Sequence, residues 1–181
     1  MEDGIDLTAK GTHVEGDLYT TVESPVGRVL LVGSERSLRG LYTNGQEPPP
    51  GARRDPMRFA EEVRQLEAYF AGELRHFDIA LEQRGTPFQL RVWDEMTSIG
   101  YGSTLAYGEL ARRVGHPSSA RAVGAACGRN PIAIVVPCHR VIGSDGSLTG
   151  YAGGVGTKRA LLMHEASTTT GRTPTLAGVL S

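Results

Sequence analysis

Short apolar segments separated by turn residues occupy the first part of the chain. Residues 18–23, 28–32 and 38–43 are rich in Val, Leu, Tyr and Thr, and the Ser-Pro-Val-Gly sequence at 24–27 is typical of a turn. Segments that favour β structure, with turn residues between them, predict a small antiparallel meander of three strands.

One helix and one further strand are predicted before residue 85. Apolar side chains at positions 59, 63, 66 and 70 follow the spacing of one helix face, and Gly72 ends the pattern. Alternation at positions 77, 79 and 81 predicts the strand. Residues 46–56, rich in Pro, Gly and Arg, are predicted to form a loop, and residues 82–85 a linker.

The second half of the chain begins and ends with a helix pattern. Thr86 suits an N-cap and Pro87 the first helical position, and helical spacing continues until Gly100. A final helix is predicted from residue 157 to about residue 166. Between the two, the apolar run 132–136 predicts a buried strand.

Two short helices with a tight connection precede that apolar run. The first starts at Tyr107 and is broken by residues 115–117; the second is capped by Ser118 or Ser119 and ends at Gly128. The pattern is that of a helix-turn-helix, and an ordinary helical hairpin is the alternative.

The second of these helices has unusually small side chains on its surface. One face is predicted to point inward and contains Ser119, Ala122, Val123 and Ala126. The exposed positions would then be Ala120, Gly124 and Ala125, with one long cation, Arg121. Because glycine and other poor helix formers weaken a helix by up to ~1 kcal/mol each, we expect another surface to approach this helix closely.

These patterns predict an α+β fold in two units. Residues 17–85 would form an N-terminal domain with a small antiparallel sheet, and residues 86–166 a mostly helical C-terminal domain with the helix-turn-helix. Residues 1–16 are polar and aperiodic, so we expect a flexible extension. Residues 167–181, rich in Ser, Thr, Gly and Pro, are expected to be a disordered tail.

Composition and charge narrow the class of protein. The 181 residues are 39% hydrophobic and 22% charged, which is typical of a globular chain. Neither a long apolar run nor a secretory signal is evident, so we expect a cytoplasmic protein without a membrane span. Residues 1–85 carry ten basic and fifteen acidic side chains (−5), whereas residues 86–165 carry eight and five (+3). The basic half is weak evidence for binding to a polyanion.

The candidate chemistry lies in the sequence Pro137-Cys138-His139-Arg140-Val141. A cysteine followed directly by histidine is a candidate nucleophile beside a candidate base. Glu165 falls on the apolar face of the last helix and would orient the histidine. Three alternatives remain open: a cysteine that only packs in the core, an exposed glutamate at a helix end, and a cysteine hydrolase in place of an acceptor of alkyl groups.

Two further features lie near this sequence. Cys127 is the only other cysteine, and in a reducing compartment the pair indicates neither a disulfide framework nor a zinc site. Residues 150–154, Gly-Tyr-Ala-Gly-Gly, form a glycine-rich segment that could wrap a small planar group with backbone donors, although most such segments are ordinary loops.

Four segments together resemble one family. They are Asn130-Pro131, the Pro-Cys-His-Arg-Val sequence at 137–141, the Ala-Arg-Ala-Val-Gly sequence at 120–124 and the glycine-rich segment 150–154. This combination is similar to the O6-alkylguanine-DNA alkyltransferases, also called methylated-DNA–protein-cysteine methyltransferases. The similarity covers about residues 86–165 and extends more loosely to the first half. It implies a ribonuclease H-like N-terminal domain and a winged-helix-like C-terminal domain.

The resemblance implies direct repair of double-stranded DNA. Cys138 would take an alkyl group, such as methyl, from O6 of guanine or O4 of thymine and keep it, so that each molecule acts once. His139 would act as the base through a water molecule and Glu165 would orient it. Tyr107 would hydrogen-bond the damaged base and donate a proton to it. The nucleotide would be flipped out of the duplex from the minor-groove side.

The resemblance also implies which residues bind DNA and the base. Arg121 would fill the space left by the flipped nucleotide, and its neighbours on the DNA side would be Ser119, Ala120, Ala122 and Gly124. Asn130 would hold the turn before the active-site segment, and Cys138 and Val141 would offer carbonyls to the guanine amino group. The rest of the pocket would be formed by Tyr151 and Ala152 in the lid loop, with Cys127 and Ala133.

This chain departs from its relatives at three places. Many relatives carry serine where this chain has Ala152, and the mammalian members carry proline at the position of Ala133. The mammalian members also bind zinc through N-terminal Cys and His, but residues 1–85 contain no cysteine, so we expect no metal and no cofactor. A non-catalytic binder of the same family would lack Cys138. We expect a monomer, with cooperative binding on DNA left open.

Overall fold

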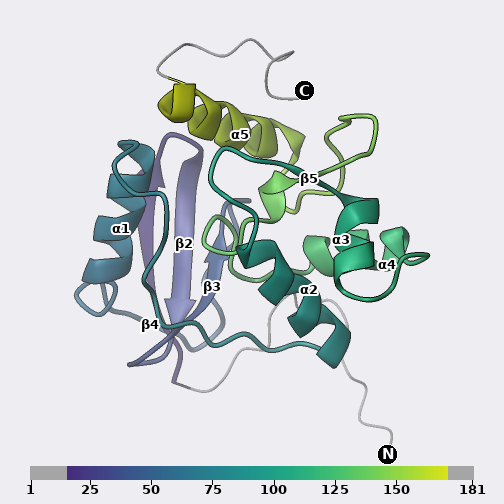
Figure 1. Ribbon diagram of the computed structural model, residues 1–181. Helices are drawn as coiled ribbons and strands as arrows, with labels where there is room; N and C mark the ends of the chain where they lie inside the picture. The colour runs from purple at the N-terminus through teal and green to yellow at the C-terminus, as the bar shows by residue number, and fades with distance from the viewer. Residues whose placement is uncertain (1–15, 171–181) are drawn as a thin grey trace, which may run out of the picture.

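A four-stranded sheet and a group of helices make up residues 16–170, the part of the chain that this computed structural model describes (Figure 1). The expectations for residues 1–15 and 171–181 lie outside this part. The strands are β1 (Leu18–Ser24), β2 (Gly27–Gly33), β3 (Leu38–Tyr42) and β4 (Arg53–Arg54). The sheet order is β3-β2-β1-β4; β2 is antiparallel to both β1 and β3, and β4 is parallel to β1.

The predicted meander is confirmed, with its first turn at the expected place. The pairing of β1 with β2 runs from Leu18↔Gly33 to Ser24↔Gly27 without a register shift. Gly27 has φ +94, a conformation that glycine adopts without the cost that a Cβ would add. Helix α1 (Ala60–Phe70) lies beside the sheet, and Gly72 follows it, as the spacing predicted (Figure 1).

Four helices follow in the second half of the chain. They are α2 (Pro87–Thr97), α3 (Tyr107–Arg113), α4 (Ala120–Gly128) and α5 (Val155–Thr170). Helix α2 starts with the predicted cap: Thr86 accepts a hydrogen bond from the Gln89 backbone, and the Gln89 side chain accepts one from the Thr86 backbone. The predicted α+β fold class is therefore confirmed. Among the described residues, no helix is long and apolar enough to cross a membrane.

The edge of β3 that does not pair with β2 is covered by two segments that we expected to be strands. Leu81 makes a single bridge to Leu38, and Ile132 makes one to Leu41, but neither segment continues as a strand. The run 132–136 turns back on itself instead, with Ile134 at φ +69. The strand prediction for this run was wrong because burial against a sheet edge needs apolar residues whether or not the backbone is extended.

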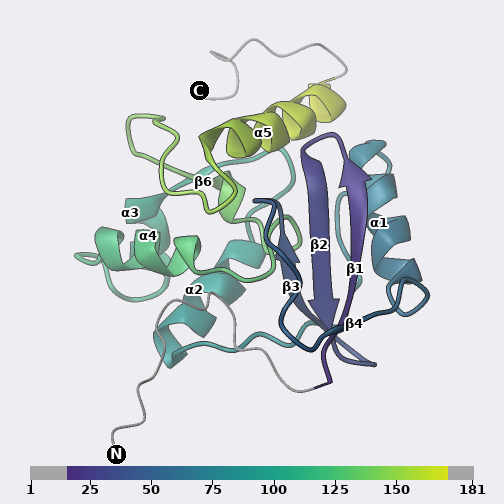
Figure 2. The ribbon, with the colours of Figure 1, turned by 180° about the vertical axis from the view of Figure 1, so that it is seen from behind.

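Helix α5 spans both halves of the molecule and is longer than expected (Figure 2). We expected it to end near residue 166 and a tail to begin at 167, but the helix continues to Thr170. The hydroxyl groups of Ser167 and Thr169 donate to the carbonyls of His164 and Glu165, and the hydroxyls of Thr168 and Tyr101 lie 2.7 Å apart. The contact with Tyr101 ties this Ser/Thr-rich stretch to the rest of the protein, and the local bonds satisfy its hydroxyl groups without themselves favouring the helix.

One continuous core joins the two halves. Buried side chains from the sheet, such as Leu31 and Leu41, belong to the same cluster as Val92 and Leu110 from the helices. Trp93 is also buried, and its indole N–H donates to the Ala126 carbonyl at 2.8 Å, which ties α2 to α4. Residues 130–142, the active segment of the following sections, come after α4 and join the edge of the sheet at Leu41.

Replacement of Thr86 by Ala should destabilise the protein by about 1 kcal/mol, because the first turn of α2 loses its side-chain acceptor. Urea unfolding at neutral pH measures this change. Thr97→Ala is the matched control, since the Thr97 hydroxyl only donates to the Asp94 carbonyl within the same exposed helix end. Equal stability of the Thr86 variant and the wild type would contradict the capping argument.

Candidate functional site

Cys138 begins a single turn of 3-10 helix, η1 (Cys138–Arg140), directly after the buried turn. The segment then enters β6 (Val141–Ile142), which pairs in parallel with β5 (Leu105–Ala106) before α3. We expected the thiol to follow a strand, but it lies at the start of a helical turn. Cys138 is only 6% exposed, so its thiol is buried just beneath the protein surface.

Asn130 connects the end of α4 to this thiol. Its side-chain amide donates to the Val136 carbonyl at 2.8 Å and to Cys138 Sγ at 3.3 Å. Its carbonyl oxygen accepts from the Ile132 backbone N–H at 3.1 Å. One buried side chain therefore holds both ends of the turn and supplies a hydrogen bond to the sulfur.

The carboxylate of Glu165 is fully buried and accepts hydrogen bonds from four residues in three parts of the chain. It accepts from His139 Nε2 at 2.7 Å, from Arg140 Nε and Nη2 at 3.0 Å each, from the Tyr69 hydroxyl at 2.8 Å and from the Gly102 backbone at 2.9 Å. Burial alone would raise the pKa of Glu165, but the hydrogen bonds and charges of His139 and Arg140 outweigh it and hold the pKa well below its usual value. Glu165 is therefore ionised at neutral pH.

His139 is a neutral base with one free nitrogen. Because the carboxylate of Glu165 only accepts, Nε2 carries the hydrogen and Nδ1 keeps a lone pair. Burial lowers the pKa of His139, the bond to Glu165 opposes this, and the nearby charges of Arg140 and Lys158 lower it further. Nδ1 is buried and has no partner within residues 16–170, so it is available to accept a proton.

The thiol of Cys138 and the imidazole of His139 are not hydrogen-bonded to each other in the described part of the chain. Burial raises the pKa of the Cys138 thiol. The bond from Asn130, the charge of Lys158 and the backbone N–H groups of Cys138 and His139 act in the opposite direction. The surroundings thus make the thiolate less costly, while burial keeps the resting thiol protonated.

Tyr107 and Lys158 form a second group of polar side chains. The Tyr107 hydroxyl donates to the Thr149 carbonyl at 2.9 Å and accepts from Lys158 Nζ at 3.3 Å. Burial, followed by the thiols of Cys127 and Cys138, raises the pKa of Tyr107 to about 12, so it remains a proton donor. Lys158 also donates to the carbonyls of Val141, at 2.5 Å, and Thr149, at 2.9 Å.

Sequence reasoning missed four of these residues. Arg140, Tyr69, Gly102 and Lys158 all contact the groups we expected to be functional. Only Lys158 left a readable signal: it precedes Glu165 by seven residues on the same helix, so both face the same side. The others come from distant elements that only the fold brings together.

The glycine-rich segment passes close to the Tyr107 hydroxyl at Gly150 and to the Thr43 hydroxyl at Gly153. Tyr151 is buried, whereas Ala152 is exposed. Gly153 packs against the Tyr151 ring and the Thr43 hydroxyl so closely that a Cβ would collide with both. The other two predicted pocket residues, Ala133 and Cys127, precede Cys138 in the chain. Ala133 is half-buried in the turn, and Cys127 is buried with its S–H directed to Met96 Sδ at 3.5 Å.

The outer surface of α4 differs in detail from the expected one. Arg121 is exposed and, among residues 16–170, makes no ion pair. Ala122 is exposed beside it, although we expected it to point inward, while Ala120 and Gly124 are only half-exposed and Ser119 is half-buried. The inward face consists of Val123, Ala126 and Cys127. The predicted face was right for Val123 and Ala126 and wrong for Ala122, because a nine-residue helix packed on α2 and α3 is buried along a stripe set by those neighbours.

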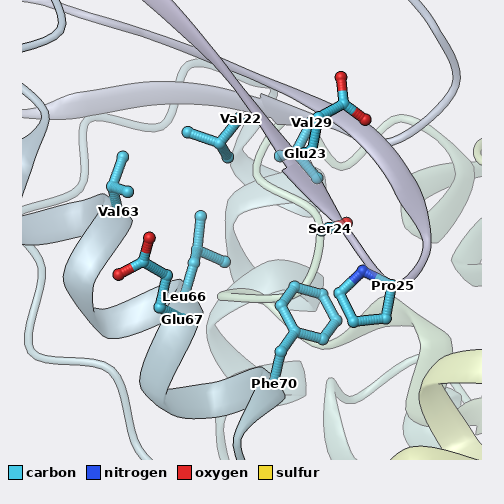
Figure 3. A pocket seen from close by; sticks show the side chains of 9 residues that line it. All are labelled: Val22, Glu23, Ser24, Pro25, Val29, Val63, Leu66, Glu67 and Phe70. Carbon is cyan, nitrogen blue, oxygen red and sulfur yellow. The ribbon is translucent and has the colours of Figure 1, made fainter.

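A separate apolar pocket of about 210 Å³ lies between the β1–β2 hairpin and α1 (Figure 3). Val22, Val63 and Phe70 line it, with Glu23 and Glu67 at its margin. It shares no residue with the group around Cys138.

Two family models match the chain, and together they cover most of it. "6-O-methylguanine DNA methyltransferase, ribonuclease-like domain" matches residues 18–83. "6-O-methylguanine DNA methyltransferase, DNA binding domain" matches residues 87–167. The boundary between the two falls at the start of α2.

Curated relatives and solved structures agree with this. The methylated-DNA–protein-cysteine methyltransferase of Mycobacterium tuberculosis is 52% identical to this chain, over 82% of this chain and 92% of its own length. The methyltransferase of the same name from Methanosarcina acetivorans is 50% identical, over 82% of this chain and 98% of its own length. The crystal structure of Mycobacterium tuberculosis OGT in complex with DNA is 48% identical, covers 91% of this chain and 99% of that one, and has a TM-score of 0.81. The crystal structure of the Mycobacterium tuberculosis O6-methylguanine methyltransferase is 51% identical, covers 84% of this chain and 94% of that one, and has a TM-score of 0.79. The chain therefore belongs to the 6-O-methylguanine DNA methyltransferase family.

Proposed function

We propose that this protein repairs alkylated double-stranded DNA by moving an alkyl group from O6 of guanine to Cys138, where it stays as a thioether. The observation that carries the proposal is the position of the thiol. It lies within hydrogen-bond distance of Asn130, directly after α4, and next in sequence to a histidine with a free ring nitrogen. A nucleophile, a base and a DNA-facing helix are thus joined in one short segment.

The reaction balances with the groups present. The thiol proton passes through a water molecule to Nδ1 of His139, which has the lone pair to take it. The sulfur forms a bond to the alkyl carbon, and the bond between that carbon and O6 breaks. The electron pair goes to the guanine, which takes a proton from Tyr107 and leaves as an ordinary base. Tyr107 must turn from the Thr149 carbonyl to the base for this step.

Glu165 would hold His139 in the orientation that this step needs. Its bond fixes the hydrogen on Nε2 and therefore the lone pair on Nδ1. The two bonds from Arg140 compensate the carboxylate charge, so that burial of Glu165 does not require a protonated imidazole. Cys138 and Val141 would accept from the guanine amino group through their carbonyls, and the lid at Tyr151 and Ala152 would cover the base.

Helix α4 would lie in the minor groove, with Arg121 in the space left by the flipped nucleotide. Its exposed surface is made of small side chains around this one cation, which lets the backbone come close to the DNA. A relative in this family, the Mycobacterium tuberculosis OGT, has been crystallised with DNA. Flipping costs a few kcal/mol and costs least for a poorly paired base, which favours damaged guanine without reading the sequence around it.

Incubation with a duplex that contains O6-methylguanine should add one methyl group per molecule, located on Cys138. The reason is that only this thiol has Asn130 and a neighbouring base beside it. Intact mass and peptide mapping measure the product, with the undamaged duplex as the control. Methylation of Cys127, or repeated turnover by one molecule, would contradict the proposal.

Arg121→Ala should slow repair of the duplex about ten- to a hundredfold, because the cost of extrusion is no longer offset. Reaction with the free O6-methylguanine base should change far less, since that substrate needs no extrusion. Arg129→Ala removes one exposed charge from the other end of α4 and is the matched control. Equal losses on duplex and free base would show that Arg121 has a general structural role.

Glu165→Gln should destabilise the protein by about 3–5 kcal/mol at neutral pH, because the buried Arg140 loses its counter-charge. The folded protein holds the pKa of Glu165 below its usual value, so the stabilisation is complete above about pH 4 and fades as the pH falls further. The difference between the variant and the wild type should therefore narrow in acid. Urea unfolding at several pH values tests this.

The control for that experiment is Glu67→Gln on the exposed side of α1, which should change stability by less than ~0.5 kcal/mol. A Glu165 variant as stable as this control would mean that the carboxylate charge is not needed to hold Arg140 and His139.

A further inference from the structure

Lys158 is a lysine with no exposed surface and with no carboxylate beside it. Its ammonium group donates to the carbonyls of Val141 and Thr149 and to the Tyr107 hydroxyl, three neutral acceptors. Within residues 16–170 it forms no ion pair. A buried cation without an opposite charge is costly, so its retention at this place needs a reason.

The charged and titratable groups around it leave few candidates for a partner. On its own helix, Glu165 is fully engaged by Arg140 and His139 from η1. The remaining groups are two tyrosines, Tyr107 from α3 and Tyr151 from the lid, and two thiols, Cys127 from α4 and Cys138 from η1. The tyrosines stay protonated, because burial raises the pKa of each hydroxyl.

Of the two thiols, Cys138 is the better placed to ionise. It accepts a hydrogen bond from Asn130, and the backbone N–H groups at the start of η1 favour its anion. The S–H of Cys127 is directed instead to Met96 Sδ, an uncharged sulfur. Lys158 is bonded to Val141, three residues after Cys138 in the same short segment, and its charge acts on both thiols. It therefore stabilises an anion at Cys138 first.

The imidazole of His139 is poorly suited to supply that positive charge. Arg140 and Lys158 already place two cations near it, and Arg140 neutralises the carboxylate that would otherwise favour imidazolium. His139 can accept the thiol proton through its free Nδ1, but a lasting charge at this position is opposed by both neighbours.

We propose that Lys158 is a positioning residue whose ammonium group is the counter-ion of the Cys138 thiolate, while His139 serves only to remove the proton. The same side chain holds Tyr107 and the carbonyls of Val141 and Thr149 to helix α5, so the charge and the geometry of the pocket depend on one group. The importance of the thiolate rests on the proposed alkyl transfer, but the pairing itself does not.

The first test measures the rate at which iodoacetamide alkylates Cys138 as a function of pH, with the product located by peptide mass. Lys158→Met should raise the apparent pKa of the thiol, so that the reaction is about tenfold slower at neutral pH and returns to the wild-type rate in alkali. Lys158→Arg, which keeps the cation, should retain most of the wild-type profile. Arg159→Met removes an exposed charge from the next position and is the matched control.

Two outcomes of this test would overturn the proposal. One is a Lys158→Met profile that matches the wild type. The other is a rate reduced equally at every pH, which would mean that Lys158 only supports the shape of the pocket. Neither arm uses DNA, so a failure here is distinct from a failure of DNA repair.

The second test remains informative if Lys158→Met does not fold. NMR titration of the Lys158 side chain should show a lower pKa in Cys138→Ser than in the wild type, since linkage between two charges is reciprocal. Cys127→Ser should lower the pKa of Lys158 less. An unchanged titration of Lys158 in Cys138→Ser would show that the two groups are not paired.

Discussion

The arrangement of the site depends on one buried carboxylate. Glu165 has no exposed surface, yet it is charged, because donors from α1, from the loop after α2 and from η1 surround both of its oxygens. A buried charge is tolerated only when such bonds replace those to water. Helix α5 lies across the sheet half and the helical half (Figure 1), and Glu165 on this helix bonds to Tyr69 of α1 and to Arg140 of η1. The charge therefore couples the position of His139 to the packing of the two halves.

A second constraint acts on the segment that carries the thiol. Backbone bonds join Leu41 in β3 to Pro131 and Ala133, which places this segment against the edge of the sheet. The chain then turns within four residues, with Ile134 in the left-handed region, where a β-branched residue is strained. Asn130 bonds across the turn and holds it closed. The edge of the N-terminal sheet thus fixes where the active segment begins.

The polar groups around Cys138 separate into two sets. In one set, Glu165, Arg140 and His139 form a compensated group in which His139 is left as a neutral base. In the other set, Lys158 and Tyr107 form a group with positive charge and an available proton. Such a division suits a reaction in which one group removes a proton from sulfur and the other delivers a proton to a leaving base.

The sequence by itself determined the elements whose signals are local. The capped start of α2, the three strands of the meander, the helix pair and the Pro-Cys-His-Arg segment were all readable, since spacing, turn residues and caps act within a few positions. Only the tertiary structure decided that the run 132–136 is a turn, because apolar residues are needed in either case when a segment is buried. It also decided which polar groups meet. Tyr69, Gly102 and Arg140 bond to Glu165 from positions up to 96 residues away, and no local pattern records such a contact.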